Sequence, residues 1–365
     1  MSTSALLAAL DTKMIAGGLA TRDEAIFDLD FHAVMHWGVD PALEKHYVPT
    51  RQRSRSVLTF FAQDSGTHNL VYANADISKA TQNREVIAFC DHWKTVTGKD
   101  PAMLIMDQKV TTQQVLGELD QRGVKFATLR MRSPALVRYI NSLTSSDYKT
   151  ITLDRPGRHN RPKVAESAAV QLTSYPGTVR QLVVTGLGRE APTVLITNNN
   201  DIKTKALIEQ YARRMTIEQR LAEIIQAFCA DALSSTVNLN VDLDIVLCVL
   251  AQALLAAFRT RLGPGYTTAT PDTLQRRFLD TPGTILNDTD TITVVLNRRA
   301  YSPVLRQSNL PADTVVPWWQ GRRLRLQFAR YPEAESAAWK SVLGDSRGED
   351  GGDIVGRSWR RAGWG

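Results

Sequence analysis

The chain has 365 residues, of which 43% are hydrophobic and 22% charged, a composition typical of a globular protein with a sizeable core. Three widely spaced cysteines without a C-x-x-C pair argue against a disulfide framework or a zinc site. The longest apolar run, 245–258, is shorter than the roughly 20 residues that a membrane span needs. The net charge of +7 favours a polyanionic partner without identifying one.

The same features predict a location inside the cell. Cys90, Cys229 and Cys248 stand among apolar residues, so we expect buried thiols in a reducing, cytoplasmic setting. No signal peptide is evident, and the run 245–258 predicts a buried core helix. No membrane partner is therefore expected.

The first part of the chain predicts a mixed sheet. Residues 1–22 predict a short helix ending at Gly17-Gly18. The segment 25–32 predicts a half-buried strand, because apolar and polar residues alternate from 27 to 32. Further elements are predicted in chain order: strands at 56–63 and 69–75, a helix at 83–96, a strand at 102–106, a helix at 112–122 and a strand at 124–130. This order predicts an α/β core over 23–135, with helices covering the sheet.

The rest of the chain divides into three segments. Short β-rich pieces separated by Pro, Gly and basic residues predict a β-rich insertion over 136–205. Segment 206–330 resumes the α/β pattern, with helices at 206–233 and 243–262 and strands at 292–299 and 323–328. The tail, 331–365, has little periodicity and is expected to be disordered.

Basic residues are concentrated at the start of the insertion. Eight of them, opposed by two aspartates, give a local charge of +6, which is eight minus two: Arg130, Arg132, Arg138, Lys149, Arg155, Arg158, Arg161 and Lys163, against Asp147 and Asp154. Such a local excess is typical of phosphate binding, and Arg155, Arg158 and Arg161 are the predicted DNA contacts. The alternative is an ordinary solvated surface.

Three acidic residues stand out by their positions. Asp30 lies on the polar face of the first strand, Asp107 ends the buried strand 102–106, and Glu218 lies on the helix that follows the insertion. Carboxylates that converge at the carboxyl ends of strands can bind hard divalent cations. Structural alternatives remain, because Asp28 shares the strand face of Asp30, Asp76 also ends a strand, and Glu218 has Arg214 at ion-pair spacing.

The segment Y-A-R-R-M-T-I-E places Tyr211, Arg214 and Glu218 in the pattern Tyr-x-x-Arg-x-x-x-Glu, on one side of the predicted helix. This pattern, together with F-D-L-D-F-H, L-I-M-D and TLRMRSPALVR, resembles the DDE transposases of bacterial insertion sequences over about residues 23–330. The resemblance implies a ribonuclease-H-like mixed sheet with flanking helices, interrupted by a β-rich insertion subdomain.

The resemblance also implies an activity. It makes Asp30, Asp107 and Glu218 the catalytic ligands of Mg²⁺ or Mn²⁺, and Tyr211 and Arg214 DNA contacts. The expected partner is double-stranded DNA, bound by a homodimer that assembles on it in the cytoplasm or nucleoid. The alternatives are a ribonuclease-H-like nuclease without strand transfer and a non-catalytic DNA-binding remnant of a decayed transposon.

Two departures from the family pattern qualify this expectation. The signature lysine falls at position 225, where this chain has Ile225 followed by Gln226. Fewer than 30 residues precede Asp30, too few for the DNA-end-recognition domain that relatives carry upstream. We therefore expect a core truncated at its N-terminus, with little sequence preference in its DNA binding.

Overall fold

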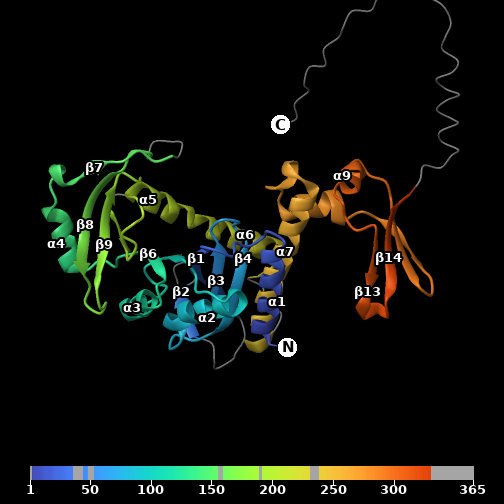
Figure 1. Cartoon of the computed structure of the whole chain (residues 1–365), viewed down its shortest axis with the longest axis horizontal. Coiled ribbons are helices and arrows are strands. Elements are labelled where there is room, and N and C mark those ends of the chain that lie inside the picture. The colour runs from blue at the N-terminus through green and yellow to red at the C-terminus, as the bar shows by residue number, and fades with distance from the viewer. Residues whose placement is uncertain are drawn as a thin grey trace, which may run out of the picture. The chain divides into compact units, whose positions relative to one another are not determined.

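The computed structural model describes residues 2–35, 44–47, 53–154, 159–188, 191–230 and 238–329. The chain divides into two compact units, Met1–Leu274 and Gln275–Gly365 (Figure 1). The boundary between them falls inside the segment 206–330, which the sequence pattern predicts as one continuous part. The predicted tail, 331–365, lies outside the described residues.

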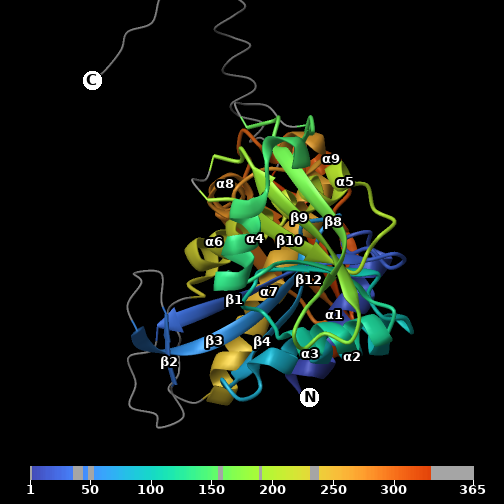
Figure 2. The ribbon, with the colours of Figure 1, turned by 90° about the vertical axis from the view of Figure 1, so that its left-hand side faces the viewer.

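Within the described residues, ten strands of the first unit form one mixed sheet. Their order is β2-β3-β1-β5-β6-β10-β9-β8-β7, and β4 also pairs with β3 (Figure 2). The strands are β1 (Ile26–Met35), β2 (Glu44–Tyr47), β3 (Arg53–Asp64), β4 (Leu70–Ile77), β5 (Met103–Met106), β6 (Lys125–Leu129), β7 (Lys149–Thr150), β8 (Lys163–Gln171), β9 (Thr178–Thr185) and β10 (Thr193–Thr197). β1 is antiparallel to β3 and parallel to β5, and β5 is parallel to β6. The predicted mixed α/β sheet is confirmed.

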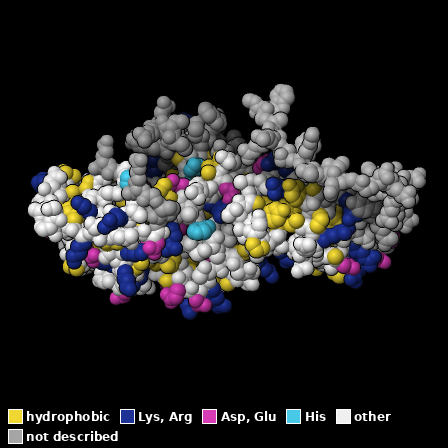
Figure 3. Space-filling view, turned by 90° about the horizontal axis from the view of Figure 1, so that it is seen from above, with side chains coloured by type: hydrophobic (Ala, Val, Ile, Leu, Met, Phe, Trp, Pro, Cys, Tyr) yellow, Lys and Arg dark blue, Asp and Glu magenta, His cyan; other side chains and the backbone are white. Residues whose placement is uncertain are grey.

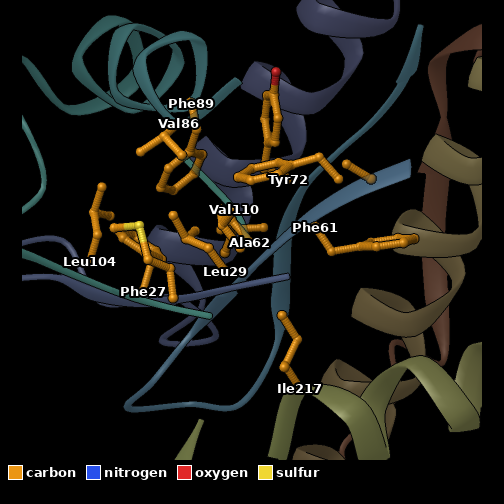
Figure 4. Packing of buried hydrophobic residues seen from close by; sticks show 14 of the residues in the cluster. Phe27, Leu29, Phe61, Ala62, Tyr72, Val86, Phe89, Leu104, Val110 and Ile217 are labelled. Carbon is orange, nitrogen blue, oxygen red and sulfur yellow. The ribbon is translucent and has the colours of Figure 1, made fainter. Parts of the chain in front are cut away.

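The alternating pattern of β1 separates an apolar face from a polar one. Phe27 and Leu29 are fully buried, and the Phe27 ring packs against those of Phe89 and Trp93, with centroids 5.0 and 4.6 Å apart (Figure 4). Because successive residues of a strand point to opposite faces, Asp28 and Asp30 point away from this core.

Helices cover both faces of the sheet. Buried residues of α1, α2 and α3 join Phe27 and Leu29 in one core. On the opposite face, Leu207 and Ile208 of α5 pack with Ile105 of β5. Ile217 of α6 belongs to the same core as the buried residues of α1, and it points toward the sheet (Figure 4). The helices of this unit are α1 (Thr3–Ala16), α2 (Glu85–Thr97), α3 (Gln113–Gln121), α4 (Pro134–Ser142), α5 (Thr204–Arg213), α6 (Met215–Phe228), α7 (Asn238–Leu262) and α8 (Pro271–Leu274).

α7 lies along β4 and supplies hydrogen bonds to that strand. Asp242 Oδ1 accepts a hydrogen bond from the Ala75 N–H at 2.9 Å, and Gln252 Oε1 accepts one from the Leu70 N–H at 3.2 Å. In the described part of the chain, the segment Asn240–Leu262 is the one helix long and apolar enough to cross a membrane, judged by length and composition alone. Its residue Ile245 is fully buried in the protein core, as predicted for a core helix.

The segment predicted as a β-rich insertion extends the core sheet. β10 pairs antiparallel with β6, and β9, β8 and β7 follow it, so no separate sheet forms among the described residues of 136–205. The segment also contains most of α4, which the β-rich pattern did not predict. Ser133 Oγ accepts a hydrogen bond from the Leu136 N–H at 3.2 Å, and Pro134 occupies the first turn, so the sequence does carry a helix-start signal there.

The second unit contains a smaller sheet. Its strands lie in the order β11-β12-β14-β13, and β12 and β14 are parallel. The elements are β11 (Gly283–Asn287), β12 (Thr291–Leu296), α9 (Ser302–Gln307), β13 (Asp313–Val316) and β14 (Arg322–Phe328). The two strands predicted in this region correspond to β12 and β14.

The cysteines follow the predicted burial in two of three cases. Cys90 and Cys248 are buried, but Cys229 is exposed. Cys229 follows the last residue of α6 and adopts a left-handed conformation with φ of 53°. The buried side of α6, with Ile217, Leu221 and Ile224, ends before it, so the expectation of a buried thiol at Cys229 was wrong.

Candidate active site

Asp30 and Asp107 lie on neighbouring parallel strands. The register places Leu29 of β1 beside Met106 of β5, and the next residues along the two strands are Asp30 and Asp107. Both aspartates are partly exposed. The parallel pairing therefore brings together two carboxylates that are 77 positions apart in the sequence.

α6 brings Glu218 to the same place through Arg214. Arg214 Nη1 lies 3.5 Å from Asp30 Oδ2, and Arg214 Nη2 lies 3.7 Å from Glu218 Oε1. Arg214 is 8% exposed, whereas the Glu218 side chain is 51% exposed. The guanidinium thus sits between two of the three predicted acidic residues.

Tyr211, Arg214 and Glu218 do not share one continuous helix. α5 ends at Arg213 and α6 begins at Met215, so the predicted helix from 206 to 233 is interrupted at Arg214. At this junction the hydrogen bonds join residues three apart, from the Arg214 N–H to the Tyr211 carbonyl at 3.2 Å and from the Ile217 N–H to the Arg214 carbonyl at 3.0 Å. Tyr211 remains beside Arg214, with Cζ 5.9 Å from the ring centroid, within the range of a cation–π contact.

The charges at this site influence one another. The pKa of Asp30 is raised to about 6, chiefly by burial and also by Glu218 and Asp107, while Arg214 and the Phe31 N–H oppose the shift. Burial alone would lower the pKa of Arg214, but the negative charges around it, Asp30 first, raise it above its usual value. Asp107 and Glu218 therefore lie close enough to Asp30 to act on it, and together the three carboxylates favour a cation.

The two alternative aspartates lie elsewhere. Asp28 shares the strand face of Asp30 but is fully buried, and burial raises its pKa to about 7. Asp76, near the end of β4, is exposed, and β3 and β1 separate its strand from β5. Asp30, which pairs with Arg214, is thus the aspartate of β1 that joins the acidic site.

The acidic site contains the carboxylates that a divalent cation needs, but in this structure they are not close enough together to coordinate one. Among the described residues, no three His, Cys, Asp or Glu side chains are close enough to hold a metal ion as they stand. Arg214 lies between Asp30 and Glu218, where it contacts both carboxylates. Carboxylate oxygens are the ligands that Mg²⁺ prefers, and the half-exposed Glu218 can turn toward the strands, so the residues fit such an ion once Arg214 withdraws.

Polar contacts on another side of α6 fix the position of this helix. Gln63 Nε2 donates to Thr216 Oγ1 at 2.9 Å, and Arg220 Nε donates to the His68 carbonyl at 2.9 Å. Glu223 forms ion pairs with both Arg220 and Arg259. Of the two residues at the missing lysine position, Ile225 packs against the core, and Gln226 lines a cavity of about 690 Å³ beside α6.

A groove without acidic residues starts next to Asp107. Two cavities of about 370 and 380 Å³ share the lining residues Gln108, Leu129, Arg130 and Met131. One adds the hydroxyl groups of Thr111, Thr112, Thr173 and Ser174, and the other adds Arg132. The sequence showed Arg130 and Arg132 within the basic cluster, but no local signal indicated that Gln108 and Ser174 would lie beside them.

Arg130 is the central cation of this groove. Its guanidinium donates to the Gln181 side chain on β9, and burial lowers its pKa. The insertion closes the groove against α3, where Gly117 leaves room for Pro176: an added Cβ would lie 2.6 Å from Pro176 Cδ. A half-buried arginine in a groove without carboxylates is a suitable site for an anionic group.

The predicted DNA-contacting arginines are only partly accounted for. Arg161 is exposed just before β8, and Arg155 and Arg158 lie outside the described residues. Other members of the basic cluster are also exposed, namely Arg132, Arg138, Lys149 and Lys163. On the face shown in Figure 3, Lys and Arg side chains are dispersed among acidic ones rather than gathered in one patch.

Comparison with known proteins gives a distant likeness in structure alone. No family model and no curated protein matches the sequence. Among solved structures, the chain is similar to the piggyBac transposase in its synaptic complex with hairpin DNA, with a TM-score of 0.36 and 12% identity over 71% of this chain. The match covers 54% of that transposase, so the chain spans about half its length. A likeness this weak identifies neither family nor function, and the site's own residues must indicate the chemistry.

Proposed function

We propose that this chain is the catalytic core of a DNA transposase, which cleaves and joins phosphodiester bonds of double-stranded DNA with Mg²⁺ or Mn²⁺. One observation carries the proposal: Arg214 lies 3.5 Å from Asp30 and 3.7 Å from Glu218, beside the parallel pair in which Asp30 of β1 neighbours Asp107 at the end of β5. This arrangement assembles residues from three distant segments into one acidic site.

The strand order supports a ribonuclease-H-like core for this enzyme. The antiparallel strands β4, β3 and β1 are followed in space by the parallel strands β5 and β6. The carboxylates lie on the face of β1 that α6 covers, and the insertion joins the sheet between β6 and α5. The order of these elements along the chain is the one expected from the resemblance.

Each residue has a part in the proposed reaction. Asp30, Asp107 and Glu218 would hold the cation, which, when bound, activates the attacking water or 3′-hydroxyl and stabilises the leaving oxygen. The groove around Arg130 would bind a backbone phosphate and align the strand beside Asp107. Tyr211, whose ring lies beside Arg214, would contact the DNA after Arg214 leaves the carboxylates.

The test is plasmid nicking and strand transfer by the full chain, with Mg²⁺ or with EDTA. We expect Asp30→Asn, Asp107→Asn and Glu218→Gln each to reduce Mg²⁺-dependent nicking by about a thousandfold or more, while DNA binding is retained. Asp76→Asn is the matched control, since it removes an exposed carboxylate at the end of another strand. Unchanged nicking in the triad variants would refute the proposed site.

Two other outcomes would redirect the proposal. Nicking without any joining of a 3′-hydroxyl end to a target duplex would make the protein a nuclease of the same fold. DNA binding with no metal-dependent cutting by the unmodified chain would leave a non-catalytic remnant. We also propose that the active species is a homodimer on DNA, which sedimentation of the chain with and without duplex would test.

A further inference from the structure

We propose that Asp28 is a positioning residue that receives the Arg214 guanidinium when a divalent cation occupies Asp30, Asp107 and Glu218. Arg214 would thus have two positions: between Asp30 and Glu218 in the free protein, and against Asp28 in the loaded one. The inference rests on the proposed function, because it concerns the same acidic site. It adds a residue and a movement that the triad does not include.

Asp28 is a poorly paired buried acid, and Arg214, whose charge acts on it, has hydrogen-bond donors that are not in use. Asp28 is fully buried, and its carboxylate oxygens make no well-formed hydrogen bond with the described residues; the Ser65 hydroxyl is the neighbouring donor that favours its charged form. Arg214 is 8% exposed, and its Nε and Nη1 atoms donate no hydrogen bond. Buried polar groups of both kinds are costly when unpaired, so a state in which they pair is favoured.

Arg214 makes only weak contacts with Asp30 and Glu218 in this structure. Its distances of 3.5 Å to Asp30 and 3.7 Å to Glu218 exceed the roughly 2.8 Å of a hydrogen-bonded ion pair. Asp28 lies two residues before Asp30 on the same face of β1, so a rotation of the arginine side chain exchanges one aspartate for the other.

A buried Arg214 needs a carboxylate as its partner in either side-chain position. A divalent cation at Asp30 and Glu218 repels the guanidinium, and a buried arginine left without a counter-charge is strongly destabilising. Asp64 is already engaged, since it accepts hydrogen bonds from the Thr21, Gly66 and Thr67 N–H groups. Gln63, which is paired with Asp28 across β1 and β3, carries no charge. Among these neighbours, Asp28 is the carboxylate that remains.

The test is Mn²⁺ binding to the full chain without DNA, measured by calorimetry on a double-mutant cycle of Asp28→Asn and Arg214→Gln. Asp28→Asn should weaken Mn²⁺ binding by about tenfold, because Arg214 then has no second carboxylate and stays at the site. In the Arg214→Gln background, Asp28→Asn should have no effect. Asp76→Asn serves as the control that removes a carboxylate elsewhere. Asparagine keeps the shape of aspartate, and the thermal transition of each variant verifies folding.

Three outcomes would overturn the inference. Unchanged Mn²⁺ affinity in Asp28→Asn would show that Asp28 does not receive the arginine. Equal weakening in both backgrounds would show that Asp28 acts on the cation directly through its charge. Absence of Mn²⁺ binding in the unmodified chain would refute the proposed function itself, and the first two outcomes would leave that function standing.

A second measurement follows the arginine directly. The Arg214 Nε–H resonance should shift and exchange more slowly with water when Mg²⁺ is added, because it gains a hydrogen-bond acceptor. The change should be absent in Asp28→Asn. A resonance that responds identically in both proteins would contradict the movement toward Asp28.

Discussion

Two buried polar clusters of the first unit differ in how well their groups are paired. Beside β4, Tyr72 Oη and Asn74 Nδ2 each donate to Glu85 Oε1 at 2.8 Å, and Asp242 accepts from a strand N–H. Beneath α6, Asp28 has only the Ser65 hydroxyl as a neighbouring donor and makes no well-formed hydrogen bond among the described residues, and Arg214 makes only long contacts. Paired buried groups hold a fold together, whereas unpaired ones with shifted pKa values mark a place where a ligand binds.

The largest test of this difference is the pH dependence of Asp28→Asn. The pKa of Asp28 is raised from 3.8 to about 7, chiefly by burial, and the Ser65 hydroxyl and the charges of Arg214 and Arg213 only partly oppose this shift. The folded state therefore holds the proton more tightly than the unfolded state. The free energy of unfolding of the unmodified chain should therefore fall as pH rises from about 4 to about 7. Asp28→Asn removes this loss. The free energy of unfolding of the variant should therefore exceed that of the unmodified chain by at most about 4 kcal/mol at pH 8.

Urea unfolding in EDTA at several pH values measures this advantage. Because Asp30 and Asp11 also have raised pKa values of about 6, the variant should keep a weaker pH dependence. If the difference in unfolding free energy between the variant and the unmodified chain does not grow between pH 5 and pH 8, the pKa of Asp28 is not raised by burial. The contrast with the β4 cluster would then disappear.

The paired cluster should respond in the opposite direction. Glu85→Ala leaves the Tyr72 hydroxyl and the Asn74 amide without their acceptor in a buried place, which should cost about 3 kcal/mol of unfolding free energy. Urea unfolding at pH 7 measures this destabilisation. Nicking by the folded variant at low temperature should be normal, and a selective defect in nicking would mean that the β4 cluster also serves the site.

The arginines predicted to contact DNA can be tested by their effect on the salt dependence of binding. Changing Arg155, Arg158 and Arg161 together to Ala should weaken binding to any duplex by about ten- to a hundredfold. It should also lower the slope of log affinity against log salt by about 2.7, since each phosphate that the variant no longer binds accounts for roughly 0.9. Lys94→Ala on α2, whose lysine pairs with Asp100, is the control with no expected change in slope. Fluorescence anisotropy at several salt concentrations measures both quantities.

Sequence patterns predicted most of the core because its periodicities are local. The alternation along β1 and the helical stripe around Phe89 and Trp93 each follow from burial of one face. The interruption at Arg214 was not predictable in the same way, since Tyr211, Arg214 and Glu218 fit an unbroken helix in spacing. Its contacts with Asp30 involve a strand nearly 200 residues earlier, and no local pattern encodes them.

The site was predicted as a set of residues but not as an arrangement. The position of Asp30 on the polar face of one strand and that of Asp107 at the end of another could be read from the sequence, and the parallel register then brings them together. The presence of Arg214 between the carboxylates and the full burial of Asp28 depend on how α6 lies on the sheet. The pairing of β10 with β6, which makes the insertion part of the core sheet, is likewise a non-local result.

The smallest predicted effect concerns Arg130, because a single bound phosphate accounts for it. Arg130→Gln should weaken duplex binding a few-fold at 0.1 M salt and lower the salt slope by about 0.9, whereas Arg130→Lys keeps the charge and should keep the slope. The Gln181 side chain, which now accepts from the guanidinium, can remain in place in both variants. Arg132, which lines the second cavity, keeps its own charge in these variants, so the expected loss is that of one phosphate contact. A slope that is the same in Arg130→Gln and in the unmodified chain would place the DNA backbone elsewhere and leave the groove beside Asp107 without a phosphate.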